Sequence, residues 1–508
     1  MNKYALISVF DKTGVVEFAK SLHELGYKII STGGTAKILL ENKIPVIPIQ
    51  KITGNPESFD GRMKTISFEI ESGILFDRTN LSHIRRAKDL DIKPIDIVVC
   101  NLYPFEKTPT IENIDVGGPT MLRAAAKNFK NVLPICNPFY YSGIIRALKT
   151  KKISDSFRRE LAAKTFAHLS FYDSQIAKYL SFGKFTEELT IAGRKIKDLR
   201  YGENPHQKAS FYIEGDSESP LSRIRKLWGR DLSLVNLTDI NAGLESVRQF
   251  NEPTAVVIKH NSPSGIALGK DPKVALERAI AADPESAFGG VIVLNKNVDK
   301  KTADVIAQFK DEKKGNIDIL AAPYINKNAL EFLKKIRKSM GIYVFGKVNK
   351  PTLKDINVKW VDQGFIVQNA DVSSKNDIRK WKVVTKKKPT KREREQMQIA
   401  WKFISRIRSN SIIVMDKDIP MTRGVGSGQT SRVRSTKIAL QQAGKHAKGA
   451  ILASDSFFPF DDSVRLAAKH RISAIIQQGG SINDKLSIEA ADKAGIAMVF
   501  TNRRAFWH

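Results

Sequence analysis

Two side chains that can carry protons, Lys259 and His260, stand side by side in the stretch KHNSPSG (259–265). The apolar run before them is typical of a strand, and the proline and glycine after them predict a turn. A helix is expected soon afterwards, within ALGKDPKVALERAI (267–280). A lysine and a histidine at such a turn can act in proton transfer. An isolated pair of this kind is more often a polar strand end facing water, so the rest of the chain has to decide.

Two turns near the N-terminus have the composition of a phosphate-binding site. STGGT (31–35) closes one predicted strand and opens a helix, where backbone N–H groups and threonine hydroxyls can surround an anion. SVFDKTG (8–14) repeats this arrangement one strand earlier. Either turn alone would be explained as a helix cap. Because they follow adjacent strands, the two turns can converge on one phosphate.

Candidates for acid–base chemistry follow in the same part of the chain. GRMKT (61–65) supplies two cations and a hydroxyl within five residues, NLYP supplies an amide and a phenol, and IDVGG supplies a carboxylate. Groups of these types at strand ends around a phosphate are typical of an acid–base site with orienting residues. Lys127 lies four residues after Arg123 on a predicted helix, where solvation alone would explain it.

Polar and glycine-rich segments also follow in the second part of the chain. They are RYGENPHQ (200–207), SAFGG (286–290), RSNS (408–411), GVGSGQTSR (424–432), ASDSFFPF (453–460) and QQGGSIND (477–484). Paired aromatic residues such as Phe457 and Phe458 usually belong to a core. Beside glycine-rich loops they can instead form the wall of a site for a flat heteroaromatic ligand.

The elements that must position these residues alternate between strand and helix in the first third of the chain. Strands are predicted at 4–9, 27–32, 45–49, 94–104 and 131–136, and helices at 15–25, 33–43 and 117–128. This alternation predicts a parallel sheet covered on both faces, with ligands bound beyond the carboxyl ends of its strands.

A long helix at 156–180 precedes a domain boundary that we expect near residue 190. The rest, 191–508, is again mixed α/β. DPESAFGG (283–290) weakly resembles SDSFFPFDD (454–462). Two related subdomains that meet near 370–395 would explain this resemblance, and chance is the alternative.

Composition limits the classes of protein to consider. The 508 residues are 42% hydrophobic and 27% charged, which is ordinary for a globular chain, and they include no apolar run of membrane-spanning length. The two cysteines, Cys100 and Cys136, lie in apolar runs, which favours buried thiols in a reducing cytoplasm. A net charge of +30 attracts phosphates or nucleic acid. Because the sequence contains no nucleic-acid-binding motif, we interpret this charge as basic faces exposed to solvent.

Taken together, these motifs resemble the bifunctional purine biosynthesis protein family, which combines phosphoribosylaminoimidazolecarboxamide (AICAR) formyltransferase with IMP cyclohydrolase. The motifs quoted above, with the C-terminal FTNRRAF, occur in the order found in that family and span essentially the whole chain. The resemblance implies a methylglyoxal-synthase-like, doubly wound parallel sheet over residues 1–190. It also implies two cytidine-deaminase-like subdomains over 191–508, without the Cys/His zinc site of the deaminases, because both cysteines lie in the first domain.

The resemblance assigns functions to individual residues. For formyl transfer from 10-formyltetrahydrofolate, His260 matches the general base, Lys259 its partner and Asn410 the residue that positions the formyl group. Nucleotide contacts match Arg200, Tyr201, Gly289 and Arg504, and the folate side matches Asp318, Phe457 and Phe458. For ring closure, the acid–base and orienting residues match Lys64, Asn101, Tyr103 and Asp115. Substrate contacts around them match Ser8, Lys12, Thr32, Gly34, Thr35, Arg62, Thr65 and Lys127.

Homodimerisation in the cytoplasm also follows from the resemblance, with formyltransferase sites built from both subunits, and a bound monovalent cation is left open. The chain departs from the family at Ser262 and Ser264, where Asn and Cys are common, and a thiol nucleophile is therefore excluded there. Phe10 and the run Ile66–Phe68 depart in the cyclohydrolase part. Two alternatives therefore remain: a formyltransferase with a decayed cyclohydrolase, and a basic nucleic-acid-binding protein that kept the fold.

Overall fold

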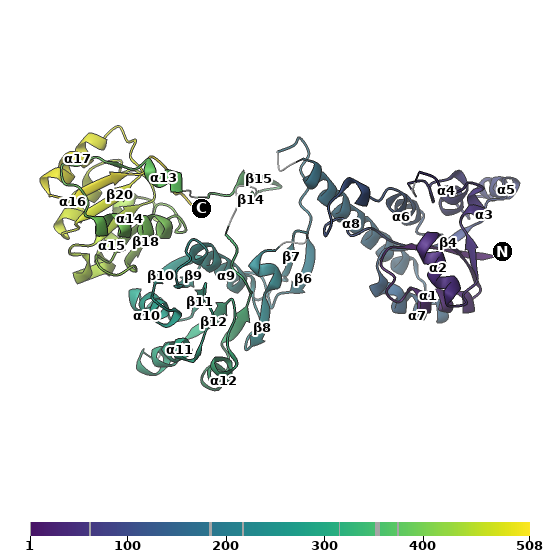
Figure 1. Ribbon diagram of the computed structural model, residues 1–508, viewed down its shortest axis with the longest axis horizontal. Coiled ribbons are helices and arrows are strands. Elements are labelled where there is room, and N and C mark those ends of the chain that lie inside the picture. The colour runs from purple at the N-terminus through teal and green to yellow at the C-terminus, as the bar shows by residue number, and fades with distance from the viewer. Residues whose placement is uncertain are drawn as a thin grey trace. The chain divides into compact units, whose positions relative to one another are not determined.

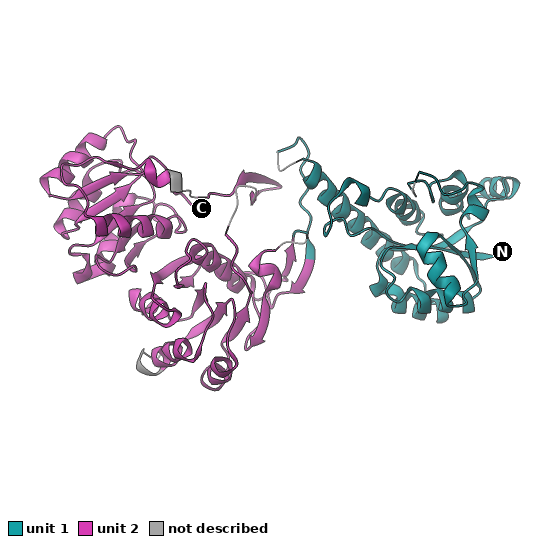
Figure 2. Cartoon of the chain, viewed as in Figure 1, with its two compact units in different colours: residues 1–194, 214–216 teal, residues 195–213, 217–508 magenta. Residues whose placement is uncertain are grey.

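The structure is a computed structural model that describes residues 2–59, 62–181, 185–215, 218–313, 315–350, 356–372 and 375–508. The chain forms two compact units (Figure 2). Unit 1 comprises Met1–Arg194 with Glu214–Asp216, and unit 2 comprises Lys195–Ile213 with Ser217–His508. Among the described residues, no helix combines the length and the apolar character needed to cross a membrane.

Unit 1 is built on a five-stranded sheet in the order β3-β2-β1-β4-β5, and every neighbouring pair of strands is parallel. Its strands are β1 (Lys3–Val9), β2 (Tyr27–Ser31), β3 (Val46–Pro48), β4 (Ile95–Asn101) and β5 (Leu133–Ile135). The predicted parallel sheet is confirmed. Alternate side chains of β1 enter two different cores, since Leu6 belongs to one hydrophobic cluster and Ile7 to the other.

Helices cover both faces of this sheet (Figure 1). They are α1 (Val15–Glu24), α2 (Gly33–Glu41), α3 (Gln50–Thr53), α4 (Phe68–Leu75), α5 (Leu81–Asp89), α6 (Gly117–Lys127), α7 (Tyr141–Lys149) and α8 (Asp155–Leu180). Short 3₁₀ turns lie at Ile111–Asn113 and Pro138–Tyr140. The helix predicted at 156–180 is confirmed as α8, which carries buried residues on both cores, among them Leu161 and Leu169.

Unit 2 contains two six-stranded mixed sheets. The first has the order β10-β9-β11-β12-β13-β8, with strands β8 (Arg225–Trp228), β9 (Thr254–Lys259), β10 (Ser262–Leu268), β11 (Gly290–Leu294), β12 (Ile317–Ala322) and β13 (Gly341–Val344). Its helices are α9 (Leu234–Val247), α10 (Pro272–Ala282), α11 (Lys300–Lys313) and α12 (Lys327–Ile336).

The second sheet has the order β18-β17-β19-β20-β21-β16. Its strands are β16 (Lys382–Val383), β17 (Ile412–Met415), β18 (Thr422–Gly426), β19 (Ile451–Ser454), β20 (Ala474–Gln477) and β21 (Ala497–Phe500), and its helices are α14 (Lys391–Ile404), α15 (Arg432–Ala443), α16 (Asp462–Lys469) and α17 (Asp484–Lys493). Strand order, strand direction and the position of each helix repeat those of the first sheet. The second half of the chain therefore contains a structural duplication.

The two sheets meet at β10 and β18. The Leu268 N–H donates to the Pro420 carbonyl at 2.8 Å, and the Ile266 N–H donates to the Thr422 hydroxyl at 3.2 Å. Smaller elements complete the unit: the hairpins β6–β7 (Arg194–Asp198, Ser210–Ile213) and β14–β15 (Ile356–Val361, Gly364–Asn369), helix α13 (Lys375–Arg379), and 3₁₀ turns at Pro220–Arg223 and Gly444–Ala447.

Two details of the sequence interpretation are wrong. The similar segments 283–290 and 454–462 do not occupy equivalent places, because the first precedes β11 whereas the second follows β19. The turn after Lys259 leads into β10, so the expected helix begins only at Pro272. Alanine and glycine in SPSGIAL gave no strand signal, but Ile266 and Leu268 are buried between the two sheets.

Candidate active sites

In unit 1, a cavity of about 520 Å³ opens beyond the carboxyl ends of β1, β2 and β4, and we call it the N-terminal cavity. Of the residues predicted for ring closure, those that line it are Ser8, Lys12, Thr32, Gly34, Thr35, Arg62, Lys64, Thr65, Asn101, Tyr103 and Asp115. Lys127 is not among the described lining residues; it is exposed at the last residue of α6.

The two glycine- or serine-containing turns converge because β1 and β2 are parallel neighbours. The Ser8 and Thr32 hydroxyl oxygens are 2.9 Å apart, and the Thr35 hydroxyl donates to the Val9 carbonyl at 3.1 Å. Gly33 has φ +39°, so a side chain there would be strained. The N-terminus of α2 begins at this point, and its N–H groups and these hydroxyls form a site suited to a phosphate.

Asn101 fixes the loop after β1 and holds it against β4. Its amide oxygen accepts hydrogen bonds from the N–H groups of Phe10 (2.7 Å) and Asp11 (2.8 Å), and its amide nitrogen donates to the Asp11 carbonyl at 3.0 Å. The neighbouring Lys12 ammonium donates to the Val9 carbonyl. Burial lowers the pKa of Lys12, and the charge of Asp11 partly opposes this shift. The Asn101 side chain thus holds the backbone of the loop after β1 in place.

Both cations of the GRMKT segment are paired with carboxylates at the cavity. Lys64 Nζ lies 2.6 Å from Glu57 Oε1, and Arg62 Nη2 lies 2.6 Å from Glu112 Oε1. Lys64 also approaches the phosphate-binding turn, since a Cβ added to Gly33 would lie 3.7 Å from its Nζ. The sequence did not single out either glutamate. Glu57 lies outside any recognisable motif, and Glu112 is 50 residues from Arg62, so no local pattern links them to these cations.

Asp115 lies two residues before the start of α6, and its Oδ1 accepts a hydrogen bond from the Gly118 N–H in the first turn of that helix at 2.8 Å. Burial raises the pKa of this carboxyl, and the hydrogen bond from Gly118 partly opposes the rise. A Cβ on Gly118 would lie 2.8 Å from Asp115 Oδ2 and 3.0 Å from the Cys100 sulfur, so only glycine fits. Tyr103 reaches the cavity from the loop after β4, with its ring edge-to-face against Phe10 at 5.4 Å.

In unit 2, a second cavity of about 630 Å³ lies beside the hairpin of β9 and β10, and we call it the hairpin cleft. Lys259 and His260 both line it, together with Val425 of β18, Ser427 just after β18 and Gln442 of α15. Lys259 Nζ donates to the Phe288 carbonyl at 2.9 Å. The lysine–histidine pair therefore lies at a cavity between the two sheets and not at an isolated strand end.

Gly289 and Asp318 lie at the same end of the first sheet as Lys259. The Gly289 N–H donates to the Asn316 carbonyl at 2.6 Å, and a side chain at Gly289 would be strained because its φ is +72°. The Asn316 amide donates to Asp318 Oδ1 at 3.2 Å. The other oxygen of Asp318 is paired with Arg230 at 2.8 Å.

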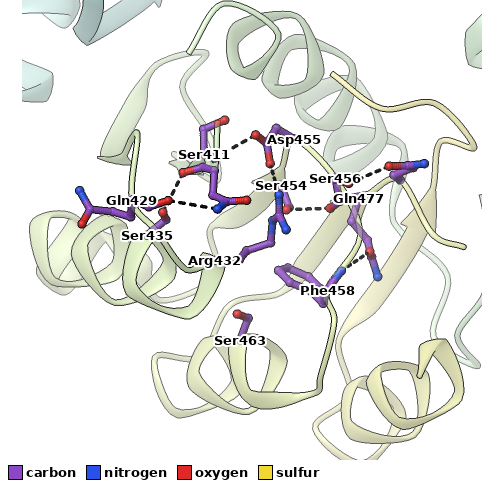
Figure 3. Close-up of polar contacts among 12 residues, drawn as sticks. Ser411, Gln429, Arg432, Ser435, Ser454, Asp455, Ser456, Phe458, Ser463 and Gln477 are labelled. Carbon is purple, nitrogen blue, oxygen red and sulfur yellow. Dashed lines mark hydrogen bonds and ion pairs between the residues drawn. The ribbon is translucent and has the colours of Figure 1, made fainter. Parts of the chain in front are cut away.

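Asn410 belongs to a polar network in the second sheet, and Figure 3 shows the part of this network around Ser411, Arg432 and Asp455. Its amide donates to the Gln429 carbonyl at 3.1 Å, and its own carbonyl accepts from the Ser435 hydroxyl at 2.8 Å. The next residue, Ser411, donates its N–H to Asp455 Oδ2 at 3.0 Å. Asp455 Oδ1 in turn accepts from Arg432 Nη2 at 2.7 Å, and both side chains of this ion pair are buried.

Contacts join this network to the hairpin. The Gln429 amide donates to the Ser427 carbonyl at 3.1 Å, and the Ser427 hydroxyl lies 3.4 Å from that of Ser262. Ser262 follows the lysine–histidine turn directly. These contacts bring the predicted base and the predicted formyl-positioning loop into one neighbourhood.

The remaining predicted residues are not among the described residues that line the hairpin cleft. Phe458 is completely buried in the core, and its N–H donates to the Gln477 side chain at 3.1 Å, whereas Phe457 is only partly buried. The Arg504 guanidinium stacks over Phe506, 4.4 Å from the ring centre. Arg200 donates to the Tyr201 hydroxyl at 2.9 Å.

Asp239 is a residue of this region that the sequence did not single out. It lies on α9, is 5% exposed, and accepts a hydrogen bond from the Asn261 N–H at 2.7 Å. Its sequence context, NLTDINAG, is an ordinary amphipathic helix. Across the described parts of the chain, no group of three or more His, Cys, Asp and Glu side chains is placed to hold a metal ion.

Comparisons with known proteins define the class to which this fold and these cavities belong. Residues 125–442 match the family model "AICARFT/IMPCHase bienzyme", and residues 14–125 match the model of the MGS-like domain. Three similar relatives, from a Thermoanaerobacter species, Acetivibrio thermocellus and Bacillus cereus, carry the name bifunctional purine biosynthesis protein PurH. They are 45%, 44% and 44% identical to this chain, and each match covers 100% of both sequences. The chain belongs to the family of bifunctional purine biosynthesis proteins and is an enzyme of that class.

Proposed function

We propose that unit 2 transfers a formyl group from 10-formyltetrahydrofolate to the 5-amino group of AICAR, and that unit 1 closes the ring of the product to give IMP. The placement of Lys259 and His260 in a cleft joined to the Asn410 network carries the first assignment. The convergence of two phosphate-binding turns beside Lys64 and Asp115 carries the second.

In formyl transfer, the amine nitrogen of AICAR attacks the formyl carbon, and the bond from that carbon to the folate nitrogen breaks. His260 accepts the amine proton, and the folate nitrogen leaves with a proton. Lys259 provides a positive charge beside the imidazole, which stabilises the developing oxyanion. Asn410 orients the formyl oxygen, and the partly exposed Phe457 offers an aromatic face to the folate. Ser264 cannot replace a cysteine as a thiol nucleophile, so the transfer is direct.

In ring closure, the carboxamide nitrogen attacks the formamide carbon and water leaves. The step is intramolecular, so holding the two groups together supplies much of the acceleration. The turns at Ser8 and Thr32 bind the phosphate, while Lys64 and Tyr103 serve the proton transfers. Burial raises the pKa of the Asp115 carboxyl, and we assign this group to the proton transfers together with Lys64 and Tyr103.

Two departures from the family do not remove these groups. Phe10 contributes its backbone N–H to Asn101 and its ring to Tyr103, and neither contact displaces a cavity residue. Ser67 caps α4 by accepting from the Ile70 N–H at 3.2 Å. These contacts favour a working cyclohydrolase over a decayed one.

The proposal includes a homodimer in the cytoplasm, with formyltransferase sites completed by a second copy. Both cysteines are buried free thiols in unit 1, which suits a reducing compartment. We propose chemistry without zinc. Whether formyl transfer depends on a bound monovalent cation is tested by measuring its rate in buffers with different monovalent ions.

The assignment is tested by product analysis with the full-length protein. Wild-type protein given AICAR and 10-formyltetrahydrofolate should produce IMP. His260→Ala should lose formyl transfer and still convert supplied formyl-AICAR to IMP, whereas Lys64→Ala should accumulate formyl-AICAR. Formyl transfer by His260→Ala at the wild-type rate would refute the assigned base. Tight binding of unrelated DNA at physiological salt without AICAR turnover would favour the nucleic-acid alternative.

A further inference from the structure

The lysine–histidine turn has an unusual backbone. Lys259 and Ser262 form the last pair of the β9–β10 hairpin, so His260 and Asn261 are its two loop residues. Their φ angles are +54° and +59°. Positive φ at both central positions is the feature of a type I′ turn, for which Asn-Gly is the preferred sequence. A histidine in the first position is strained, because a side chain disfavours this left-handed backbone conformation.

One buried carboxylate holds this turn. Asp239 Oδ1 accepts the Asn261 N–H at 2.7 Å, and the side chain is 5% exposed. Burial raises the pKa of Asp239, while the hydrogen bond from Asn261, the charge of His260 and a hydrogen bond from the His260 N–H oppose the rise. The hydrogen bond from the Asn261 N–H thus ties the turn to this buried carboxyl group.

The packing of α9 places Asp239 there. Gly243 lies four residues later, on the same face of the helix. A Cβ at Gly243 would lie 2.4 Å from the Val293 side chain and 3.4 Å from that of Ile258. Because only a glycine permits this approach, α9 lies close against β9 and β11, and Asp239 reaches the end of β9. An isolated carboxylate buried to this degree is costly unless it is hydrogen-bonded or faces a positive charge.

We propose that Asp239 is a positioning residue for formyl transfer: it holds the His260–Asn261 turn and supplies the negative charge that stabilises His260 once it has accepted the amine proton. Lys259, adjacent in sequence, carries a positive charge, and Asp239 places the opposite charge beside the same turn. The other charged groups that line the hairpin cleft are Asp283 and Glu285, on the loop after α10. Of these carboxylates, Asp239 is the one bonded to the turn itself.

This role rests on the proposed function of His260, and the test is designed to separate the two. Asp239→Asn retains an oxygen acceptor for the Asn261 N–H and removes the charge. Loss of a general base costs about 10²–10⁴-fold, so a residue that acts through it should cost less, about 10–100-fold in kcat for formyl transfer. The KM for AICAR should change less than about threefold, because Asp239 does not contact the substrate. Asp239→Ala, which also removes the acceptor, should be slower still.

The controls use the same full-length chain. Glu245→Gln removes a charge from the same helix and should leave kcat unchanged. Ring closure of supplied formyl-AICAR should be normal in every variant, and calorimetric unfolding of Asp239→Asn should show unit 2 folded. Adding Asn261→Gly to Asp239→Ala should recover part of the lost kcat, because glycine adopts the turn without an anchor.

The outcomes are distinct. If His260→Ala abolishes formyl transfer while a folded Asp239→Asn keeps the wild-type kcat, the positioning role of Asp239 is refuted. The assignment of His260 as the general base is then still supported. An increase in KM alone would also refute it, since that would indicate a substrate contact. If His260→Ala itself is active, the proposed function fails first.

Discussion

The buried ion pair beneath Asn410 gives the prediction with the largest expected effect on stability. The Arg432 and Asp455 side chains are 7% and 0% exposed, and their charged atoms lie 2.7 Å apart (Figure 3). Asp455→Asn leaves the guanidinium buried without its counter-charge. Breaking a buried pair from one side costs about 3–5 kcal/mol, because the remaining charge has lost its compensation but not its desolvation penalty. Asp455 also holds the Ser411 N–H, so the Asn410 loop should loosen at the same time.

Calorimetry of the full-length chain measures this cost. The two units can unfold in separate transitions. The midpoint temperature of the transition assigned to unit 2 should decrease by on the order of 5 °C or more, while the midpoint temperature for unit 1 should not change. Arg465→Ala is the matched control, because Arg465 forms a pair with Asp461 at 2.6 Å but is 71% exposed. It should cost less than about 1 kcal/mol. A loss below about 1 kcal/mol for Asp455→Asn would show that burial does not set the strength of this pair.

Three further predictions concern other parts of the chain. Burial lowers the pKa of His168 from 6.5 to about 4, so between these pH values the unfolded chain binds a proton that the folded chain does not. The free energy of unfolding of unit 1 should therefore fall as the pH drops from about 6.5 to 4. His168→Leu should remove this part of the pH dependence when unfolding is measured across that range. Phe10→Ser should reduce the kcat of ring closure several-fold without affecting formyl transfer, because Tyr103 loses its edge-to-face contact of about 0.5–1.5 kcal/mol. Gly243→Ala should destabilise unit 2 by about 1–3 kcal/mol in denaturant unfolding, since its Cβ would lie 2.4 Å from Val293.

Each of these has a contradicting result. If the free energy of unfolding of unit 1 in the His168 variant still varied with pH between about 4 and 6.5 as it does in the wild type, other groups would be responsible for that pH dependence. Unchanged ring closure in Phe10→Ser would make the aromatic contact irrelevant to catalysis. Wild-type stability of Gly243→Ala would mean that α9 can move away from the sheet at little cost.

The elements of unit 1 were largely predictable because their signals are local. β-branched runs, a helical period and glycine stops predicted β1, α1 and β2 within one or two residues, and Gly26 does have a positive φ of +85°. Parallel pairing then brings the carboxyl ends of strands to one edge. The contact between Ser8 and Thr32 follows from that rule.

What the sequence did not reveal depends on contacts between distant residues. β10 was missed because burial between two sheets, not alternation, makes SPSGIAL a strand. The duplication of unit 2 lies in strand order and direction, so a short similarity of sequence pointed to the wrong pair of segments. Asp239 looks like any polar helix residue until the packing at Gly243 brings it to the turn. For the aromatic pair, the sequence offered a core and a ligand wall as alternatives, and it could not show that Phe458 is buried while Phe457 is only partly buried.

The central claim is that two separate sites on this chain perform successive reactions, and mixing two variants tests it directly. AICAR and 10-formyltetrahydrofolate are incubated with His260→Ala, with Lys64→Ala and with an equal mixture of both, and the products are separated by chromatography. We expect unreacted AICAR with the first protein, formyl-AICAR with the second, and IMP with the mixture, because formyl-AICAR released by one protein is closed by the other. Failure of the mixture to form IMP, or formation of IMP by either variant alone at the wild-type rate, would contradict the assignment of the two sites.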